Sequence, residues 1–118
     1  MVAHGGGALP FLAARLDRCW EVIPACRVHL DRKPSEVLRQ IYADTALFGA
    51  WEATKCGLRF FGPERVLFAS DSPFDPEKGT YYIRETLKIL DGLKLSKAKY
   101  KAIMHGNLEK LTGRKLVK

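Results

Sequence analysis

The sequence predicts an α/β fold in which short parallel strands alternate with crossover helices. Three short apolar segments, each followed by a polar residue, are separated by longer segments in which apolar residues recur every three or four positions. The segment 65–70 is apolar on both faces, as is typical of a parallel strand covered by helices. With 118 residues, 47% of them hydrophobic and 28% charged, the chain has the composition of one globular domain with a single core.

The first part of the chain is predicted to contain a strand end, a glycine-rich turn and a helix. Val2 and Ala3 have the character of a strand end. The glycines at 5–7 permit positive φ angles and close approach of the backbone. Apolar residues then follow a helical rhythm over 9–23, and Pro24 ends this helix.

The next part is predicted to contain a loop, a strand and a second helix. Residues 25–34 form the loop, and Ser35 caps a short turn over 36–39. A strand over 40–45 has a polar end, and a helix follows over 48–60. Its place between two helical segments makes this strand parallel to its neighbours.

The strand over 65–70 has the strongest strand pattern in the chain, and the loop over 71–76 follows it. Thr80 is expected to cap a helix that runs through Leu90, and Ser96 to cap the helix after that. Three parallel strands make a small sheet, so its edges are expected to be bare.

The end of the chain is predicted to hold a break and a last short helix. Gly106 and Asn107 are expected to end the helix that Ser96 begins. Leu108 and Leu111 then supply the apolar side of a short helix that ends at Gly113.

The net charge is +7, and many of the cations lie near the C-terminus. They form either a patch for nucleic acid or another anionic surface, or the solvated face of amphipathic helices; apolar residues at helical spacing among them favour the second. The three cysteines match no zinc-binding pattern, which predicts reduced thiols in a cytoplasmic protein. The sequence has neither a signal peptide nor an apolar run long enough for a membrane span, so we expect no membrane partner. Because the cations are interleaved with apolar residues at helical spacing, we expect no nucleic-acid partner either.

Three polar residues follow the predicted strands, where active sites of parallel α/β folds lie. His4 can act as a general acid or base or as a ligand, or can be a histidine without function. Asp71 can bind a divalent metal or orient a histidine, or can form an Asx turn. Asp44 can contact substrate or belong to a turn.

Four segments of this sequence, in order, resemble the amidohydrolase-related family, in the branch typified by aminocarboxymuconate-semialdehyde decarboxylase and the resorcylate decarboxylases. Residues 4–11 with Arg15 resemble the sixth-strand motif, and 42–45 the seventh strand. Residues 62–74 resemble the eighth strand with its loop, and 106–111 the closing helix. The resemblance implies that residues 1–118 are the C-terminal three βα units of a (β/α)8 TIM barrel, which in full takes about 250 residues.

The resemblance also implies roles for individual residues. Asp71 matches a ligand of a divalent metal, usually zinc and in some members manganese. His4 matches the histidine that relays protons as general acid and base. Arg15 matches an arginine that reaches into the neighbouring subunit of a homodimer and holds the carboxylate of a small substrate.

The departures from the family pattern concern the metal. The histidine pair of the first strand and the histidine of the fifth strand are absent, and neither His29 nor His105 lies where it could replace them. Because zinc takes three or four protein ligands, Asp71 alone is not expected to hold it tightly.

The sequence therefore predicts part of a metal-dependent hydrolase or decarboxylase for a small carboxylated, often aromatic, substrate, inactive on its own. One alternative is a non-catalytic half-barrel that joins a partner chain through bare edges at residues 2–4 and 65–70. The other is a basic nucleic-acid-binding module, for which the sequence contains no recognition motif.

Overall fold

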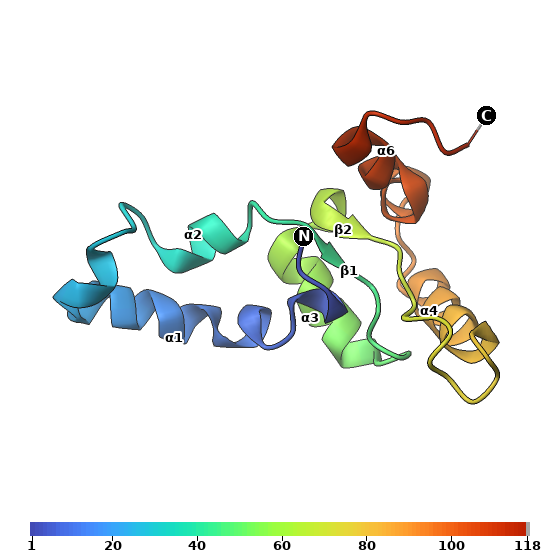
Figure 1. The fold of residues 1–118 in the computed structure, drawn as a ribbon, viewed down its shortest axis with the longest axis horizontal. Helices are drawn as coiled ribbons and strands as arrows, with labels where there is room; N and C mark the ends of the chain where they lie inside the picture. The colour runs from blue at the N-terminus through green and yellow to red at the C-terminus, as the bar shows by residue number, and fades with distance from the viewer. Residues whose placement is uncertain (118) are drawn as a thin grey trace.

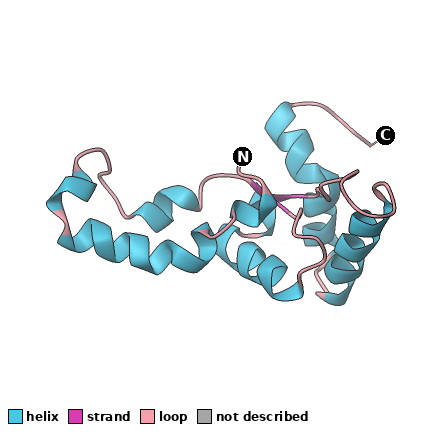
Figure 2. Cartoon of the chain, turned by 60° about the horizontal axis from the view of Figure 1, so that its bottom comes forward, coloured by secondary structure: helices cyan, strands magenta, loops and turns pink. Residues whose placement is uncertain are grey.

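The structure, a computed structural model, describes residues 1–117 and has very short strands among many helices. Strands β1 (Ala43–Asp44) and β2 (Val66–Leu67) pair in parallel, with Ala43 opposite Val66. Val2 adds a parallel bridge on the other side of β1. Figure 2 shows the strands surrounded by helices. The parallel order confirms the predicted α/β fold of three βα units from a (β/α)8 barrel, although each strand is shorter than expected.

Helices α1 (Leu9–Val22) and α2 (Pro34–Leu38) form an arm that projects from the strands. The two helices lie side by side in Figure 1, joined by the turn Pro24–Arg27 and a loop. The Asp17 carboxylate accepts hydrogen bonds from the backbone N–H of Ser35 at 2.8 Å and from its hydroxyl at 2.7 Å. The expectation that Ser35 caps the short turn over 36–39 is therefore wrong, because Ser35 lies within α2 and its hydroxyl binds α1 instead.

Helices α3 (Trp51–Phe61) and α4 (Thr80–Gly92) pack beside the strands. The helix expected from residue 48 begins only at Trp51, because Phe48 and Gly49 adopt positive φ angles of 55° and 81° in a turn. Thr80 was expected to cap α4, but it does not. The carboxylate of Asp75 takes that role, because it accepts backbone N–H groups from Glu77 and, in the first turn of α4, from Tyr81 and Tyr82.

The last helical segment is continuous where a break was expected. Ser96 caps α5 (Lys97–Lys101), as predicted, by accepting the Lys99 N–H. A wider π-helical turn (Ala102–Gly106) leads directly into α6 (Asn107–Thr112). Gly113 ends α6 in the left-handed conformation, with φ 70°, as predicted.

The π-helical turn allows this helical segment to bind β2. In a regular α-helix the Asn107 N–H would bond to the carbonyl of Ile103, but here it bonds to that of Ala102. The freed Ile103 carbonyl accepts the Phe68 N–H at 2.9 Å. The buried Asn107 side chain donates from Nδ2 to the carbonyls of Pro63 and Val66, both at 2.7 Å.

These bonds cover part of the outer edge of β2, which was expected to be bare. The Leu67 carbonyl faces β1, because it accepts the Thr45 N–H at 3.0 Å. Successive strand residues direct their backbone groups to opposite sides, so the Val66 carbonyl and the Phe68 N–H face away from β1. Both groups are bonded to the C-terminal helical segment. The expectation of a bare edge over 65–70 is therefore wrong at these two positions.

The core lies where α3, α4 and the C-terminal helical segment meet the strands. Its buried side chains come from these elements and, in the case of Ala13, from α1: Ala13, Ala43, Phe60, Phe61, Val66, Leu90 and Ile103. The arm adds few of them and leaves Phe11 and Val28 exposed. Within residues 1–117 no helix combines the length and the apolar character that crossing a membrane requires.

We predict that Asn107→Ala destabilises the protein by about 2 kcal/mol, within the roughly 1–3 kcal/mol that an unsatisfied buried polar group costs. The variant leaves two backbone carbonyls without their donor. Urea unfolding measures the loss. Thr112→Ala is the matched control, because it removes an exposed hydrogen bond to the Leu108 carbonyl in the same helix and should change stability by less than about 0.5 kcal/mol. Equal losses in the two variants would contradict the role given to Asn107.

Candidate functional site

His4 lies in the turn after the first bridge, with one ring nitrogen fixed and its side chain otherwise open to solvent. Its Nδ1 is 3.0 Å from the carbonyl oxygen of Ala46. Because a carbonyl can only accept, Nδ1 must carry a proton, and the proton that the imidazole can exchange is therefore the one on Nε2.

Asp44, at the end of β1, ties the His4 turn to the segment after β1. Its buried carboxylate accepts the backbone N–H groups of Gly5 and Ala46 on the same oxygen, Oδ1, each at 3.1 Å. The structure thus brings two of the three predicted strand-end residues together. Asp44 has the turn role that the sequence left open, since it holds the backbone on both sides of the His4–Ala46 contact.

Asp71 follows β2 in a strained backbone conformation, with φ 64°, and is only partly exposed. The chain that leads to it is fixed by Thr45, whose hydroxyl donates to the Ala69 carbonyl at 2.8 Å and accepts the Ala69 N–H at 3.0 Å. The Asp71 carbonyl accepts the Phe74 N–H at 3.2 Å. This role of Thr45 was not predicted from the sequence. The only indication in the sequence is that a residue with a hydroxyl group directly follows the strand.

A row of two aromatic rings extends from His4. The ring of Phe48 lies 5.8 Å from that of His4, and the ring of Tyr82, from α4, lies 4.8 Å from that of Phe48. Phe48 was expected to begin a helix, but the turn at 48–49 presents its ring to His4 instead. A side-chain row of this kind offers an apolar surface beside the proton-exchanging imidazole.

Arg15 does not join this group. It lies in the middle of α1, is exposed, and sits on the arm that projects away from the strands (Figure 1).

The donor set does not fit a metal ion on its own. Asp44 uses Oδ1 for two backbone N–H groups, which leaves His4 and Asp71 as the candidate ligands among the strand-end residues. No group of three or more His, Cys, Asp or Glu side chains suited to a metal ion occurs within residues 1–117. Zinc sites use three or four protein ligands, so these residues do not form such a site.

A family model described as amidohydrolase matches residues 1–114. The chain belongs to the amidohydrolase family. No curated protein matches the sequence significantly.

Solved structures similar to this amidohydrolase chain include several decarboxylases. The IDCase of Metarhizium anisopliae, in apo form, is 26% identical with a TM-score of 0.75, over 92% of this chain and 32% of that one. For 5-carboxyvanillate decarboxylase from Sphingomonas paucimobilis the identity is 22% and the TM-score 0.75, over 96% of this chain and 33% of that one. Dihydroxybenzoic acid decarboxylase from Polaromonas sp. JS666, with bound manganese and 2-nitroresorcinol, is 23% identical with a TM-score of 0.73, over 96% of this chain and 33% of that one.

The amidohydrolase chain thus spans about a third of the length of these solved structures, between 32% and 33%. At 22% and 23% identity, the last two likenesses concern the fold alone.

The glycines at 5–7 provide a test of how the site is packed. All three have positive φ angles, and a Cβ on Gly6 would lie 2.7 Å from the ring of Phe61, whereas one on Gly7 would meet nothing within 4 Å. We expect Gly7→Ala to cost about 1–3 kcal/mol in backbone strain, because φ 56° with ψ −129° is a conformation that residues with a Cβ rarely adopt. Gly6→Ala adds an overlap that costs about 1–3 kcal/mol more. Urea unfolding of the two variants measures the difference, and equal losses would contradict the close packing of Gly6 against Phe61.

Proposed function

We propose that this chain supplies His4, Asp71 and Arg15 to the active site of a metal-dependent carboxy-lyase that acts on a small aromatic carboxylate. The observation that carries the proposal is the fixed Nδ1 of His4, at the carboxyl end of the strands, in a fold shared with decarboxylases. A hydrolase of the same family would use the same residues, but the similar structures are named as decarboxylases.

His4 delivers the proton in this reaction. Decarboxylation breaks the bond between the ring carbon and the carboxyl carbon, CO2 leaves, and the electron pair stays on the ring carbon. That carbon takes the proton from Nε2 of the His4 imidazolium. The Ala46 carbonyl keeps the other proton on Nδ1, so His4 ends as the neutral tautomer without a change in its hydrogen bond.

Phe48 and Tyr82 supply the surface for the substrate ring. Phe48 lies beside the His4 imidazole and Tyr82 lies beside Phe48, a row that suits a flat aromatic group. Arg15 binds a substrate carboxylate in a second subunit of a homodimer, for which its exposure on the projecting arm is suitable.

Asp71 would be one ligand of a divalent metal, zinc or manganese, and the other ligands would come from another part of the enzyme. A divalent metal at such a site supplies Lewis acidity and orients the substrate. Manganese is present in the similar dihydroxybenzoic acid decarboxylase.

This proposal can be tested with a chimera in which residues 1–117 replace the matching third of 5-carboxyvanillate decarboxylase. We expect it to bind manganese and to decarboxylate 5-carboxyvanillate measurably. His4→Asn should lower kcat by about 100-fold or more, the contribution typical of a general acid. His29→Asn, an exposed histidine on the arm, is the matched control and should leave kcat unchanged.

Circular dichroism and the manganese content verify that each chimera is folded and loaded. A folded, manganese-loaded chimera without activity would contradict the decarboxylase proposal. An unchanged kcat in His4→Asn would contradict the proton-transfer role while leaving the reaction class in place.

The isolated chain should bind zinc only weakly, because its own residues form no complete ligand set. Calorimetric titration of the 118-residue chain with zinc measures this. A dissociation constant below about 1 μM would show that the chain has a metal site of its own, contrary to the proposal.

A further inference from the structure

A small hollow lies near the N-terminal end of β2, at the opposite end of the strand from Asp71. Its volume is about 260 Å³, and it lies between α3, the segment after α4 and the start of α5. Pro63, just before β2, contributes one wall. The site proposed above lies beyond the other end of the strands, so this hollow does not belong to it.

The floor of the hollow is apolar and anchored to the core. Leu58, Leu93 and Leu95 line it, and all three side chains are partly buried and packed against the core cluster. Pro63 is fixed through its carbonyl, which accepts the hydrogen bond from Asn107 at 2.7 Å. The hollow is thus formed by side chains that the fold already holds in place, as ligand pockets usually are.

The rim of the hollow is cationic. Lys55 and Arg59, one helical turn apart on α3, stand on one side, and Lys99 of α5 stands on another. No Asp or Glu lines the hollow. Within residues 1–117, neither Arg59 nor Lys99 forms an ion pair, and the only ion pair of Lys55 is with the exposed Glu52, at 3.4 Å.

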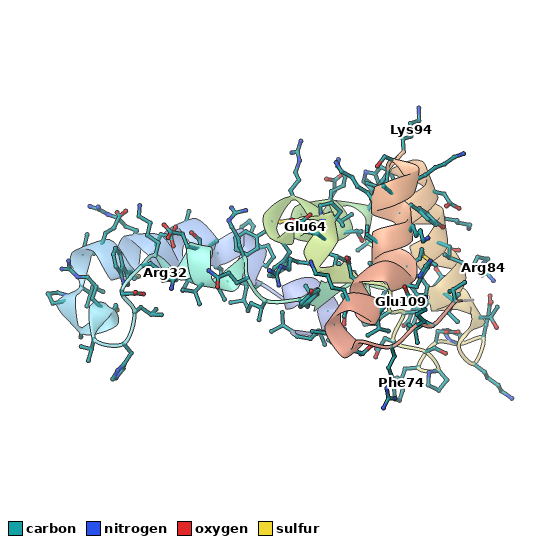
Figure 3. The ribbon with its side chains drawn as sticks, turned by 90° about the horizontal axis from the view of Figure 1, so that it is seen from above. Arg32, Glu64, Phe74, Arg84, Lys94 and Glu109 are labelled. Atoms are coloured by element: carbon teal, nitrogen blue, oxygen red, sulfur yellow. The ribbon has the colours of Figure 1, made fainter. Side chains whose placement is uncertain are left out.

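A second hollow on the other side of Lys55 and Arg59 is less suited to an anion. It has a larger volume, about 400 Å³, but Glu52 is part of its lining and would repel a negative charge. Lys94, just after α4, lines neither hollow, and its side chain points away from the body of the protein (Figure 3).

We propose that the hollow beside Lys99 binds a small amphiphilic carboxylate, with its apolar group on Leu58, Leu93 and Leu95 and its charge at the rim. An apolar floor below unpaired cations complements such a molecule in both of its parts. The volume of about 260 Å³ lies just below the range of roughly 300–1,000 Å³ for drug-sized ligands, so the apolar group is a short acyl chain or a single ring.

Titration of the ¹⁵N-labelled chain with octanoate, benzoate, 1-octanol and sulfate tests this proposal by NMR. We expect octanoate or benzoate to shift the amide signals of Leu93, Leu95 and Lys99 saturably, and the tighter of the two identifies an acyl or an aromatic group. Octanol, which has no charge, and sulfate, which has no apolar part, should each bind at least about tenfold more weakly.

Two double variants test which cations bind the carboxylate group. The double variant Arg59→Gln, Lys99→Gln should weaken carboxylate binding at least about tenfold, which corresponds to about 1.4 kcal/mol, because it removes both unpaired cations of the rim. The double variant Lys110→Gln, Arg114→Gln removes the same charge from exposed residues elsewhere and should leave binding unchanged. The proposal would be overturned if octanol bound as tightly as octanoate or if both double variants weakened binding equally. It would also be overturned if the only amide signals to shift came from residues outside the hollow.

Discussion

The hydrogen bonds between the C-terminal helical segment and β2 are the constraint on which the rest of this structure depends. A sheet with so few strand residues is marginal by itself, because most of its backbone groups lack a strand partner. Asn107 and the carbonyl of Ile103 supply partners on the side of β2 away from β1. The π-helical turn is what makes both possible, since it frees one carbonyl at the position where the helix meets the strand. β2 is thereby held between β1 and a helix.

The sequence predicted those features that depend on local pattern. The helix over 9–23 and the cap at Ser96 were found because apolar spacing and capping chemistry act within a few residues. Ser35 and Thr80 were misassigned because their local sequence is suited to a cap. A residue distant in sequence, Asp17, takes the Ser35 hydroxyl, and Asp75 supplies the cap of α4 from the preceding loop. A π-helical turn has no sequence signal of its own, so the continuous helix through Gly106 could not be predicted.

The candidate site was predictable in position but not in detail. Parallel strands place their carboxyl ends at one edge, so His4 and Asp44 were expected to lie near each other, and the shared contacts with Ala46 confirm it. The direction of the His4 ring depends on a carbonyl 42 residues away. The link from Thr45 to Ala69 likewise joins residues distant in sequence. Such contacts follow from tertiary packing, which no spacing rule encodes.

The net charge of +7 has different explanations in different parts of the fold. On the arm and α4 the cations form ion pairs with neighbouring carboxylates, such as Lys33 with Glu21 and Arg84 with Glu77. There the charges are paired on the exposed surface of the helices. Arg59 and Lys99 have no such partners in residues 1–117 and stand instead above an apolar floor. Because unpaired cations beside one hollow repel each other, an anion bound among them relieves that repulsion, whereas paired cations gain little from one.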